Sequence, residues 1–177
     1  MSFKRMMEKS MMERESRIVL ALDSIPSKRG DLLSASLRML RKVHPYICAV
    51  KINNHLLLPL GLYGGVKRII EEAHSLGLPI IMDCKINDIG YTNRVIAENF
   101  FNAGFDAVTA NPFVGWEDGL QPVFEAARRM NGGVILLVYM SHKASREGYG
   151  QTIYDAETNE RLSLIHISEP TRPRLIS

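Results

Sequence analysis

Hydrophobic residues along the chain gather in five short runs that are rich in β-branched side chains. Such runs predict buried β-strands, which we place at residues 17–23, 47–53, 79–85, 107–113 and 133–141. Between the runs, hydrophobic positions recur with helical spacing, which predicts helices at residues 31–43, 64–76, 92–103 and 117–130. In the last of these helices, Leu120, Phe124 and Ala127 share one face. Strands and helices therefore alternate, with the strands about 30 residues apart.

This alternation predicts an α/β fold built on a parallel sheet. Parallel neighbours need a crossover connection, and their strands are buried on both faces, which accounts for the continuous hydrophobic runs. Two architectures fit this order of elements: a (β/α)8 barrel and an open, doubly wound sheet. A doubly wound sheet that binds dinucleotides carries a glycine-rich turn after its first strand, whereas Asp23-Ser24-Ile25-Pro26 follows that strand here.

Polar residues mark the carboxyl ends of the predicted strands. They are Asp23, Lys51, Asn53, Asp83, Lys85, Asn111 and Ser141. Because the carboxyl ends of parallel strands meet at one rim, and because a (β/α)8 barrel builds its active site there, the pattern favours the barrel. We therefore predict a (β/α)8 TIM barrel, of which this chain supplies about the first five β/α units.

The composition fits one globular domain and argues against two other classes of protein. The chain has 177 residues, of which 46% are hydrophobic and 23% are charged. Its formal net charge of +3 comes from 22 basic and 19 acidic residues spread along the chain, without the basic patch of a nucleic-acid-binding protein. No hydrophobic run reaches the roughly 18 residues that a membrane span needs. We expect a cytoplasmic protein that binds neither nucleic acid nor a membrane.

Three regions are expected along the chain. Residues 1–16 form a helical lead-in, because basic and acidic residues interrupt their Met-rich sequence. Residues 17–154 form the partial barrel. The sequence from about Leu162 is similar to a translated sequencing adapter, so we expect residues 155–177 to be a non-native or disordered tail.

One polar cluster is predicted at the end of the third strand. Side chains alternate along a strand, so Asp83 and Lys85 project to the same face, while Asp88 lies just beyond the strand. Lys51 ends the neighbouring strand and is expected beside Asp83, which gives an alternating array of two lysines and two aspartates. Partly desolvated charges are costly to gather in a cleft, so the array indicates a catalytic site. A structural network of ion pairs at the rim is the alternative.

The residues around this cluster resemble those of orotidine 5′-phosphate decarboxylases. The resemblance rests on DCKINDI at residues 83–89, with LALD at 20–23, NPFVG at 111–115 and MSH at 140–142. It extends from about Arg17 to about Ile153. The pattern Asp-x-Lys-x-x-Asp is shared with hexulose-phosphate synthases and ketogulonate-phosphate decarboxylases, which resemble each other in an acidic, magnesium-binding residue on the second strand. Lys51 at that position is similar to the orotidylate enzymes and indicates a site without metal.

The resemblance implies conversion of orotidine 5′-monophosphate to UMP and carbon dioxide, in de novo pyrimidine biosynthesis and without a cofactor. It implies that Lys85 protonates C6 of the pyrimidine and that Asp83 lies near the departing carboxylate. The residues that it assigns to catalysis are Lys51, Asp83, Lys85 and Asp88. Those that it assigns to substrate binding are Asp23, Lys51, Ile89, Thr92 and Ser141. It also implies a homodimer in which Asp88, Ile89 and Thr92 reach into the neighbouring subunit's site.

The five predicted strands are fewer than the eight of a closed barrel. We therefore expect the first and fifth strands to be unpaired edges of the sheet. In these barrels the loops after strands seven and eight bind the substrate phosphate, so we expect this chain to lack the phosphate-binding loops. Two readings compete with the decarboxylase: a magnesium-dependent sugar-phosphate lyase of the same barrel group, and an inactive fragment that only dimerises or binds nucleotide.

Overall fold

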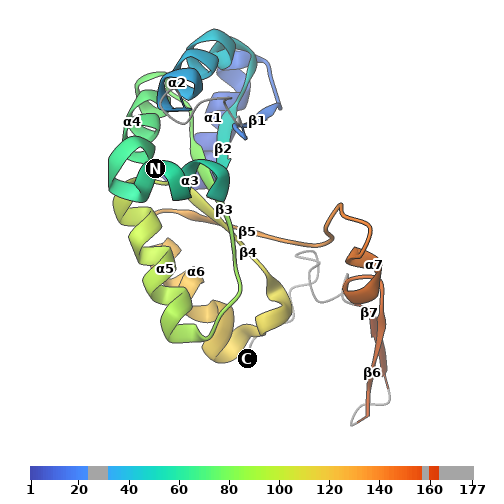
Figure 1. Ribbon diagram of the computed structural model, residues 1–177. Helices are drawn as coiled ribbons and strands as arrows, with labels where there is room; N and C mark the ends of the chain where they lie inside the picture. Colours follow the sequence, from blue (N-terminus) through green and yellow to red (C-terminus); the bar gives the residue numbers. More distant parts are fainter. Residues whose placement is uncertain (24–31, 157–159, 164–177) are drawn as a thin grey trace.

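Five parallel strands form the central sheet of the molecule, in the order β1-β2-β3-β4-β5 (Figure 1). The structure is a computed structural model that describes residues 1–23, 32–156 and 160–163. The strands are β1 (Val19–Ala21), β2 (Ala49–Asn53), β3 (Ile80–Ile86), β4 (Ala107–Ala110) and β5 (Gly133–Leu136). Each overlaps a predicted strand, and each neighbouring pair is parallel. The predicted parallel α/β architecture is confirmed, with β1 and β5 as the two edges of the sheet.

Helices follow the strands and cover one face of the sheet (Figure 1). The four that the sequence predicts are α2 (Leu32–Val43), α4 (Lys67–Ser75), α5 (Gly90–Ala103) and α6 (Gln121–Arg129). They pack their apolar sides on the sheet and on each other, with α5 between β3, β4 and α6. Every helix in the described ranges is too short or too polar to cross a lipid bilayer.

The sequence pattern does not predict several short helical segments between the main elements. They are the 3₁₀ helices η2 (His44–Tyr46) and η4 (Pro112–Val114) and the helix α3 (Asn54–Leu60). The π-helical turns η3 (Gly61–Val66) and η5 (Trp116–Leu120) overlap the starts of the helices predicted at residues 64–76 and 117–130. Helix α3 starts directly after β2 because the Asn53 side chain accepts a hydrogen bond of 2.8 Å from the His55 N–H and caps the first turn. Strand β4 ends before the predicted residue 113 because Pro112 cannot donate to the ladder.

The two faces of the sheet pack against different partners. Val50, Ile52, Ile80 and Met82 belong to the large core shared with the covering helices. The opposite, inner face carries a smaller core, formed by Cys48, Ala49, Ile81 and Ala107 with Phe3, Met7, Met11 and Ile135 around it. Because side chains alternate along a strand, the next inward positions toward the carboxyl ends are Lys51, Asp83 and Thr109. The inner face is therefore apolar where the strands start and polar where they end.

Helix α1 (Phe3–Arg14) covers the apolar part of the inner face. The backbone N–H of Phe3 donates to the Asn131 carbonyl at 3.2 Å, just before β5. At the other end of the helix, the Arg14 guanidinium donates to the Leu76 carbonyl, just before β3. One helix thus connects the beginnings of β3 and β5, which lie on either side of β4 in the sheet.

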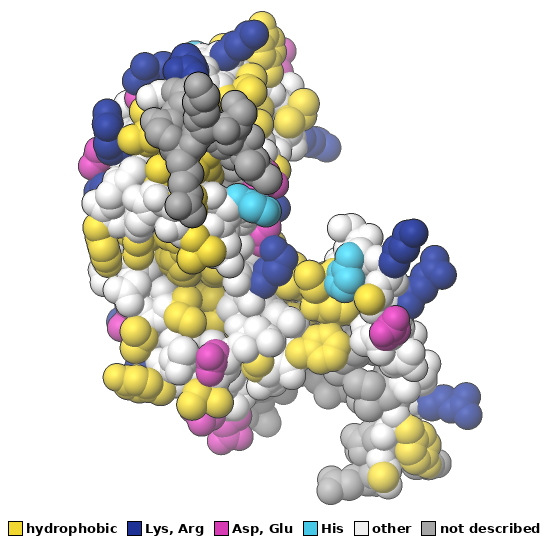
Figure 2. All heavy atoms as spheres, viewed as in Figure 1, with side chains coloured by type: hydrophobic (Ala, Val, Ile, Leu, Met, Phe, Trp, Pro, Cys, Tyr) yellow, Lys and Arg dark blue, Asp and Glu magenta, His cyan; other side chains and the backbone are white. Residues whose placement is uncertain are grey.

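The chain leaves the sheet after β5 and forms an arm (Figure 1). The prediction that the fifth strand extends to residue 141 is wrong, because β4 ends at Ala110, opposite Leu136, and offers later residues no ladder to join. The arm contains α7 (Ser145–Gly148) and an antiparallel pair of strands, β6 (Thr152–Asp155) and β7 (Glu160–Ser163). This pair lies across the predicted start of the tail at residue 155, where the sequence pattern predicts no strand. Figure 2 shows a deep notch between the arm and the body of the sheet.

An ion pair ties α4 to the loop before β4. His74 Nε2 lies 2.9 Å from Asp106 Oδ2, and the same oxygen accepts a hydrogen bond of 2.8 Å from the Ile80 N–H. The hydrogen bond with Asp106 raises the pKa of His74, while burial and the nearby Lys67 oppose this shift only in part. The folded state therefore holds this proton more tightly than the unfolded chain does. The stability that the pair contributes is full below about pH 6.5 and is lost as the pH rises through the raised pKa.

We expect His74→Gln to lower the melting temperature more at about pH 5.5 than at about pH 8.5, because only the protonated imidazole forms the ion pair. Thermal unfolding of both proteins across this range measures the difference. His44→Gln is the matched control, since the His44 ring contacts the Arg41 carbonyl and forms no ion pair with any residue that the structure describes. An equal loss at both pH values would contradict the expectation.

Candidate active site

Three charged side chains meet on the inner face, near the carboxyl ends of β2 and β3. Lys51 Nζ lies 2.8 Å from Asp83 Oδ2, and Lys85 Nζ lies 2.8 Å from Asp83 Oδ1. The aspartate is 8% exposed, whereas the lysine side chains are 33% and 39% exposed. A buried carboxylate thus holds two ammonium groups whose other sides face the open rim.

The register of the parallel strands brings the first pair together. Asn53 of β2 stands opposite Asp83 of β3, and Lys51 stands opposite Ile81, two residues earlier on each strand. Lys51 and Asp83 therefore occupy successive inward positions on neighbouring strands. The length of the lysine side chain spans the one step between them. The sequence prediction that Lys51 lies beside Asp83 agrees with this geometry.

Lys85 reaches the same carboxylate through an irregularity in β3. The ladder pairs Met82 with Val108 and Ile86 with Ala110, so three residues of β3 stand opposite the single residue Thr109 of β4. Lys85, inside this bulge, has a positive φ of 50°. Left-handed backbone costs a non-glycine residue about 1–3 kcal/mol and is concentrated at functional sites. Bulges of this kind often redirect a side chain next to an active site.

Thr109 is a fourth member of the cluster, and the sequence reasoning missed it. Its Oγ1 donates to Asp83 Oδ1 at 3.0 Å and accepts a hydrogen bond of 2.8 Å from the Lys85 N–H. The available signal was the alternation in β4, where Thr109 is the polar residue between Val108 and Ala110. The hydroxyl contacts both residues on which the chemistry of the site is expected to depend.

The electrostatic balance of the cluster keeps the carboxylate charged. Burial alone would raise the pKa of Asp83, but the hydrogen bonds from Lys51, Lys85 and Thr109 outweigh it and hold the pKa below its usual value. The site therefore presents a fixed negative charge between two positive ones at neutral pH. Burial also raises the pKa of the neighbouring Cys84 thiol to about 11, so this cysteine stays protonated and unreactive.

Asp23 lies next to the cluster, at the end of β1. Its Oδ1 accepts a hydrogen bond of 2.8 Å from Asn53 Nδ2, and Asn53 stands opposite Asp83 in the sheet. The side chain of Asp23 is exposed and available to a ligand at the rim. The sequence marks Asn53 as a polar residue at the rim, and the structure brings it between Asp23 and the strand that carries Asp83.

Asp88 does not join the cluster within this chain, which differs from the four-membered array expected from sequence. Its side chain is exposed, and its Oδ1 accepts a hydrogen bond of 2.7 Å from the Ile89 N–H. The buried Asn93 side chain bonds to the backbone N–H and carbonyl of Asp88 and to the Gly119 carbonyl, which fixes the loop. Ile89 beside it is 67% exposed, and Thr92 is half-buried in the first turn of α5.

Ser141 lies apart from the charged cluster. It is exposed in the arm, five residues beyond the end of β5 at Leu136, and among the described residues it has no hydrogen bond to Lys51, Asp83 or Lys85. The expected role of Ser141 in binding the pyrimidine stays a prediction.

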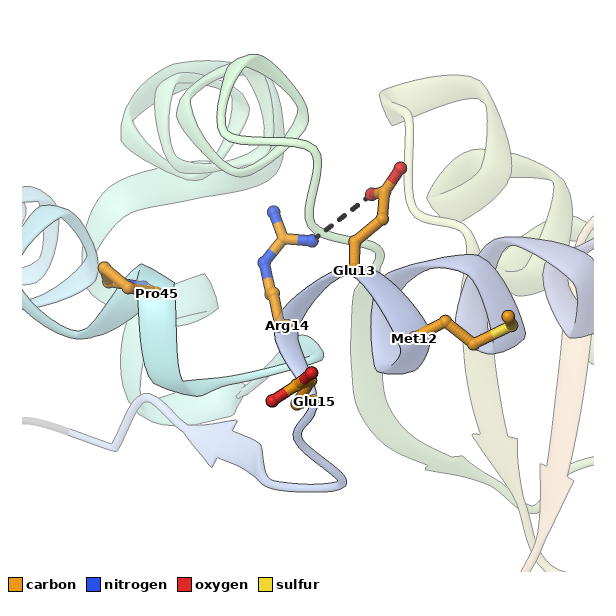
Figure 3. Close-up of a pocket in the computed structure, with 5 residues that line it drawn as sticks. All are labelled: Met12, Glu13, Arg14, Glu15 and Pro45. Carbon is orange, nitrogen blue, oxygen red and sulfur yellow. Dashed lines mark ion pairs between the residues drawn. The ribbon is translucent and has the colours of Figure 1, made fainter.

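One hollow among the described residues lies at the end of α1, away from the charged cluster (Figure 3). It measures about 490 Å³ and is lined by Met12, Glu13, Arg14, Glu15 and Pro45. Arg14 points toward Glu13 and is already bonded to the Leu76 carbonyl, so it serves to hold α1 in place. Within the described part of the chain, no three His, Cys, Asp or Glu side chains converge to hold a metal ion. The charged cluster is thus the best candidate for an active site.

Comparison with known sequences identifies one family. The model of the "Orotidine 5′-phosphate decarboxylase / HUMPS family" matches residues 16–164. The chain is 36% identical over 166 residues to an orotidine 5′-phosphate decarboxylase of Thermococcus kodakarensis, and the match covers 92% of this chain and 70% of that relative. It is 33% identical over 174 residues to an enzyme of the same name from Aeropyrum pernix, with 93% and 66% of the two chains covered.

Solved structures give the same picture of the fold. A putative orotidine-monophosphate decarboxylase from Toxoplasma gondii superposes with a TM-score of 0.77 at 22% identity, over 93% of this chain and 56% of that chain. Orotidine 5′-phosphate decarboxylase from Pyrococcus horikoshii superposes with a TM-score of 0.59 at 30% identity, over 74% and 56%. The likeness confirms the predicted (β/α)8 barrel, of which the described residues form five strands. This chain spans little more than half the length of these solved chains.

Proposed function

Because the chain belongs to the orotidine 5′-phosphate decarboxylase / HUMPS family, we propose that the protein of which it forms part converts orotidine 5′-monophosphate to UMP and carbon dioxide. The observation that carries this proposal is the cluster of Lys51, Asp83 and Lys85 at the carboxyl ends of two barrel strands. The product is a pyrimidine nucleotide, which assigns the protein to pyrimidine biosynthesis.

The proposed chemistry depends on fixed charges. Loss of carbon dioxide leaves a carbanion at C6 of the pyrimidine, and the ring delocalises this charge poorly. Stabilisation must then come from a cation that is already in place when the charge develops. Lys85 supplies it, because Asp83 holds its ammonium group at 2.8 Å and leaves the other side open to the rim. The same ammonium then delivers a proton to C6 as the general acid.

Asp83 has a second task in this proposal, since its charge faces the substrate carboxylate. Two like charges about 4 Å apart repel by about 4 kcal/mol at an effective dielectric constant near 20. This repulsion disappears as carbon dioxide leaves, so it favours the reaction. The lowered pKa of Asp83 supports this task, because the residue stays charged at neutral pH despite its burial. The reaction as proposed needs no cofactor.

Lys51 and Asp23 are proposed to position the ribose. Both lie at the rim next to the reacting centre, and Asn53 connects Asp23 to the strand that carries Lys51. Lys51 also holds Asp83 from the side opposite Lys85. A lysine at this position does not serve as a magnesium ligand, which supports orotidylate rather than a magnesium-bound sugar phosphate as the substrate. Ser141 is proposed to bind the pyrimidine edge.

We further propose a homodimer in which Asp88, Ile89 and Thr92 complete the neighbouring subunit's site. The Asp88 carboxylate bonds to the Ile89 N–H and not to the cluster of its own chain, and the exposed Ile89 and Tyr91 are close to it in the sequence. Large apolar side chains that are 67% and 68% exposed are typical of a surface that another subunit covers. The loop that carries Asp88 is fixed by Asn93 and is therefore ready to present the aspartate to a partner.

Activity is proposed for the complete protein, since this chain spans 70% and 66% of two curated relatives and 56% of two solved chains. Barrels of this kind bind the substrate phosphate with loops after strands seven and eight. We propose that this protein acts in the cytoplasm, which fits its two free cysteines, Cys48 and Cys84.

The proposal predicts that the complete protein consumes orotidine 5′-monophosphate at the same rate with and without EDTA. The loss of orotidylate absorbance measures this rate. The reason is that Lys85 rather than a metal ion stabilises the carbanion. Loss of activity in EDTA would instead support a magnesium-dependent lyase. Calorimetry with UMP separates a third outcome, binding without turnover, which would contradict the decarboxylase.

A further inference from the structure

Thr109 is the point at which β4 supports the irregular part of β3. Between the pairs Met82–Val108 and Ile86–Ala110, it is the β4 residue that faces the bulge. A bulge interrupts the ladder and leaves backbone groups without their usual partners. The Lys85 N–H is such a group, and it donates to the Thr109 hydroxyl at 2.8 Å instead of to a carbonyl. A side chain therefore replaces a backbone acceptor at the residue that carries the proposed general acid.

The same hydroxyl also holds the carboxylate. A threonine hydroxyl has one donor and two acceptor positions. Its proton goes to Asp83 Oδ1 at 3.0 Å, and one lone pair receives the Lys85 N–H. Thr109 is 5% exposed, so water does not readily replace either bond. Oδ1 is the oxygen that also binds Lys85 Nζ, so a small turn of the carboxylate would move the ammonium group as well.

We propose that Thr109 is a positioning residue that fixes the carboxylate of Asp83 and the strained backbone of Lys85, so that the Lys85 ammonium group stands where negative charge develops. The inference rests on the proposed decarboxylase function for its catalytic consequence. The geometric part of the inference does not depend on the substrate. It is that one hydroxyl sets both the rotamer of Asp83 and the positive φ of Lys85. The lowered pKa of Asp83, to which this hydrogen bond contributes, agrees with it.

The first test follows Asp83 by NMR in the chain labelled with carbon-13 at its aspartate carboxyl groups, with Asp83→Asn to assign the signal. Thr109→Val keeps the branched shape and removes the hydroxyl, so we expect the pKa of Asp83 to rise toward its usual value. Thr109→Ser keeps the hydroxyl and should leave the titration unchanged. Thr152→Val, the same change on an exposed strand of the arm, is the matched control. An unchanged Asp83 titration in Thr109→Val overturns the proposal.

The second test measures kcat and KM for orotidylate in the complete protein. We expect Thr109→Val to lower kcat about tenfold and to change KM less than about twofold, because the bond acts on the position of the catalytic charges. Thr109→Ser should retain kcat within about twofold. A loss of kcat that is equal in the two variants, or a change confined to KM, overturns the proposal.

The outcomes separate this inference from the proposed function. If the wild-type protein does not consume orotidylate, the proposed function fails and the Asp83 titration alone decides the role of Thr109. If Thr109→Val does not fold, as judged by circular dichroism, Thr109→Ser decides. Wild-type kcat and Asp83 titration in Thr109→Ser then support the role of the hydroxyl, whereas a tenfold loss of kcat overturns it.

Discussion

Replacing Lys85 by alanine is expected to lower kcat of the complete protein by about four orders of magnitude, because the change removes a preorganised cation and the general acid together. The structure explains why no other group takes over. Lys51, which carries the other ammonium group of the cluster, is bonded to Asp83 Oδ2, whereas Lys85 is bonded to Oδ1. KM should change much less than kcat, since the interaction with Lys85 strengthens as negative charge develops.

Two further variants sharpen this test. Lys85→Arg keeps the positive charge, but arginine does not release a proton at neutral pH, so we expect most of the loss to remain. Lys9→Ala removes an exposed lysine of α1, at the opposite end of the strands, and should leave kcat unchanged. Exchange of the C6 hydrogen of UMP for deuterium reports the proton transfer directly. Wild-type exchange in Lys85→Ala would be incompatible with Lys85 as the proton donor.

Mixing two inactive variants is expected to restore about a quarter of the wild-type activity. One variant is Lys85→Ala and the other is Asp88→Ala. If each site combines Lys85 of one subunit with Asp88 of its neighbour, a mixed dimer has one intact site out of two. Random exchange of subunits makes about half of the dimers mixed, so about a quarter of all sites recover.

The structure motivates this experiment through the direction of Asp88. Within one chain its carboxylate bonds to the Ile89 N–H and not to Lys85, although only two residues separate Asp88 from Lys85 in the sequence. An aspartate that acted within its own chain would give no recovery on mixing, because each site would still lack one residue. Mixing Lys85→Ala with Lys85→Arg is the control, since no combination of these chains contains an intact Lys85.

Periodicity in the sequence predicts the regular part of this fold well. Strands such as β3 are continuous hydrophobic runs, and the helices between them repeat their apolar positions about every three to four residues. Their order alone predicts a parallel sheet. The end of β5 could not be predicted in this way, because residues 137–141 are as apolar as a strand and lack only a neighbour with which to pair.

The regular part of the site was also predictable, since Lys51 and Asp83 follow from alternation along strands and the register between them. Lys85 lies where alternation predicts, but for a different reason: the bulge and its positive φ bring it to Asp83. A bulge depends on how two strands pair, and the sequence of β3 or of β4 taken alone does not contain that information. Thr109 was missed for the same reason, because its role exists only opposite the bulge.

Helix α1 also bears on the order in which the chain folds. Phe3, Met7 and Met11 pack on residues from β2, β3 and β4. The Phe3 N–H donates a hydrogen bond to the carbonyl of Asn131, in the loop that leads into β5. This surface does not exist until all of these strands are made and paired. During synthesis the chain emerges from its amino end, so α1 leaves the ribosome before the five strands and cannot dock until β5 has followed. Helix α1 is thus translated before the sheet and reaches its final position after it.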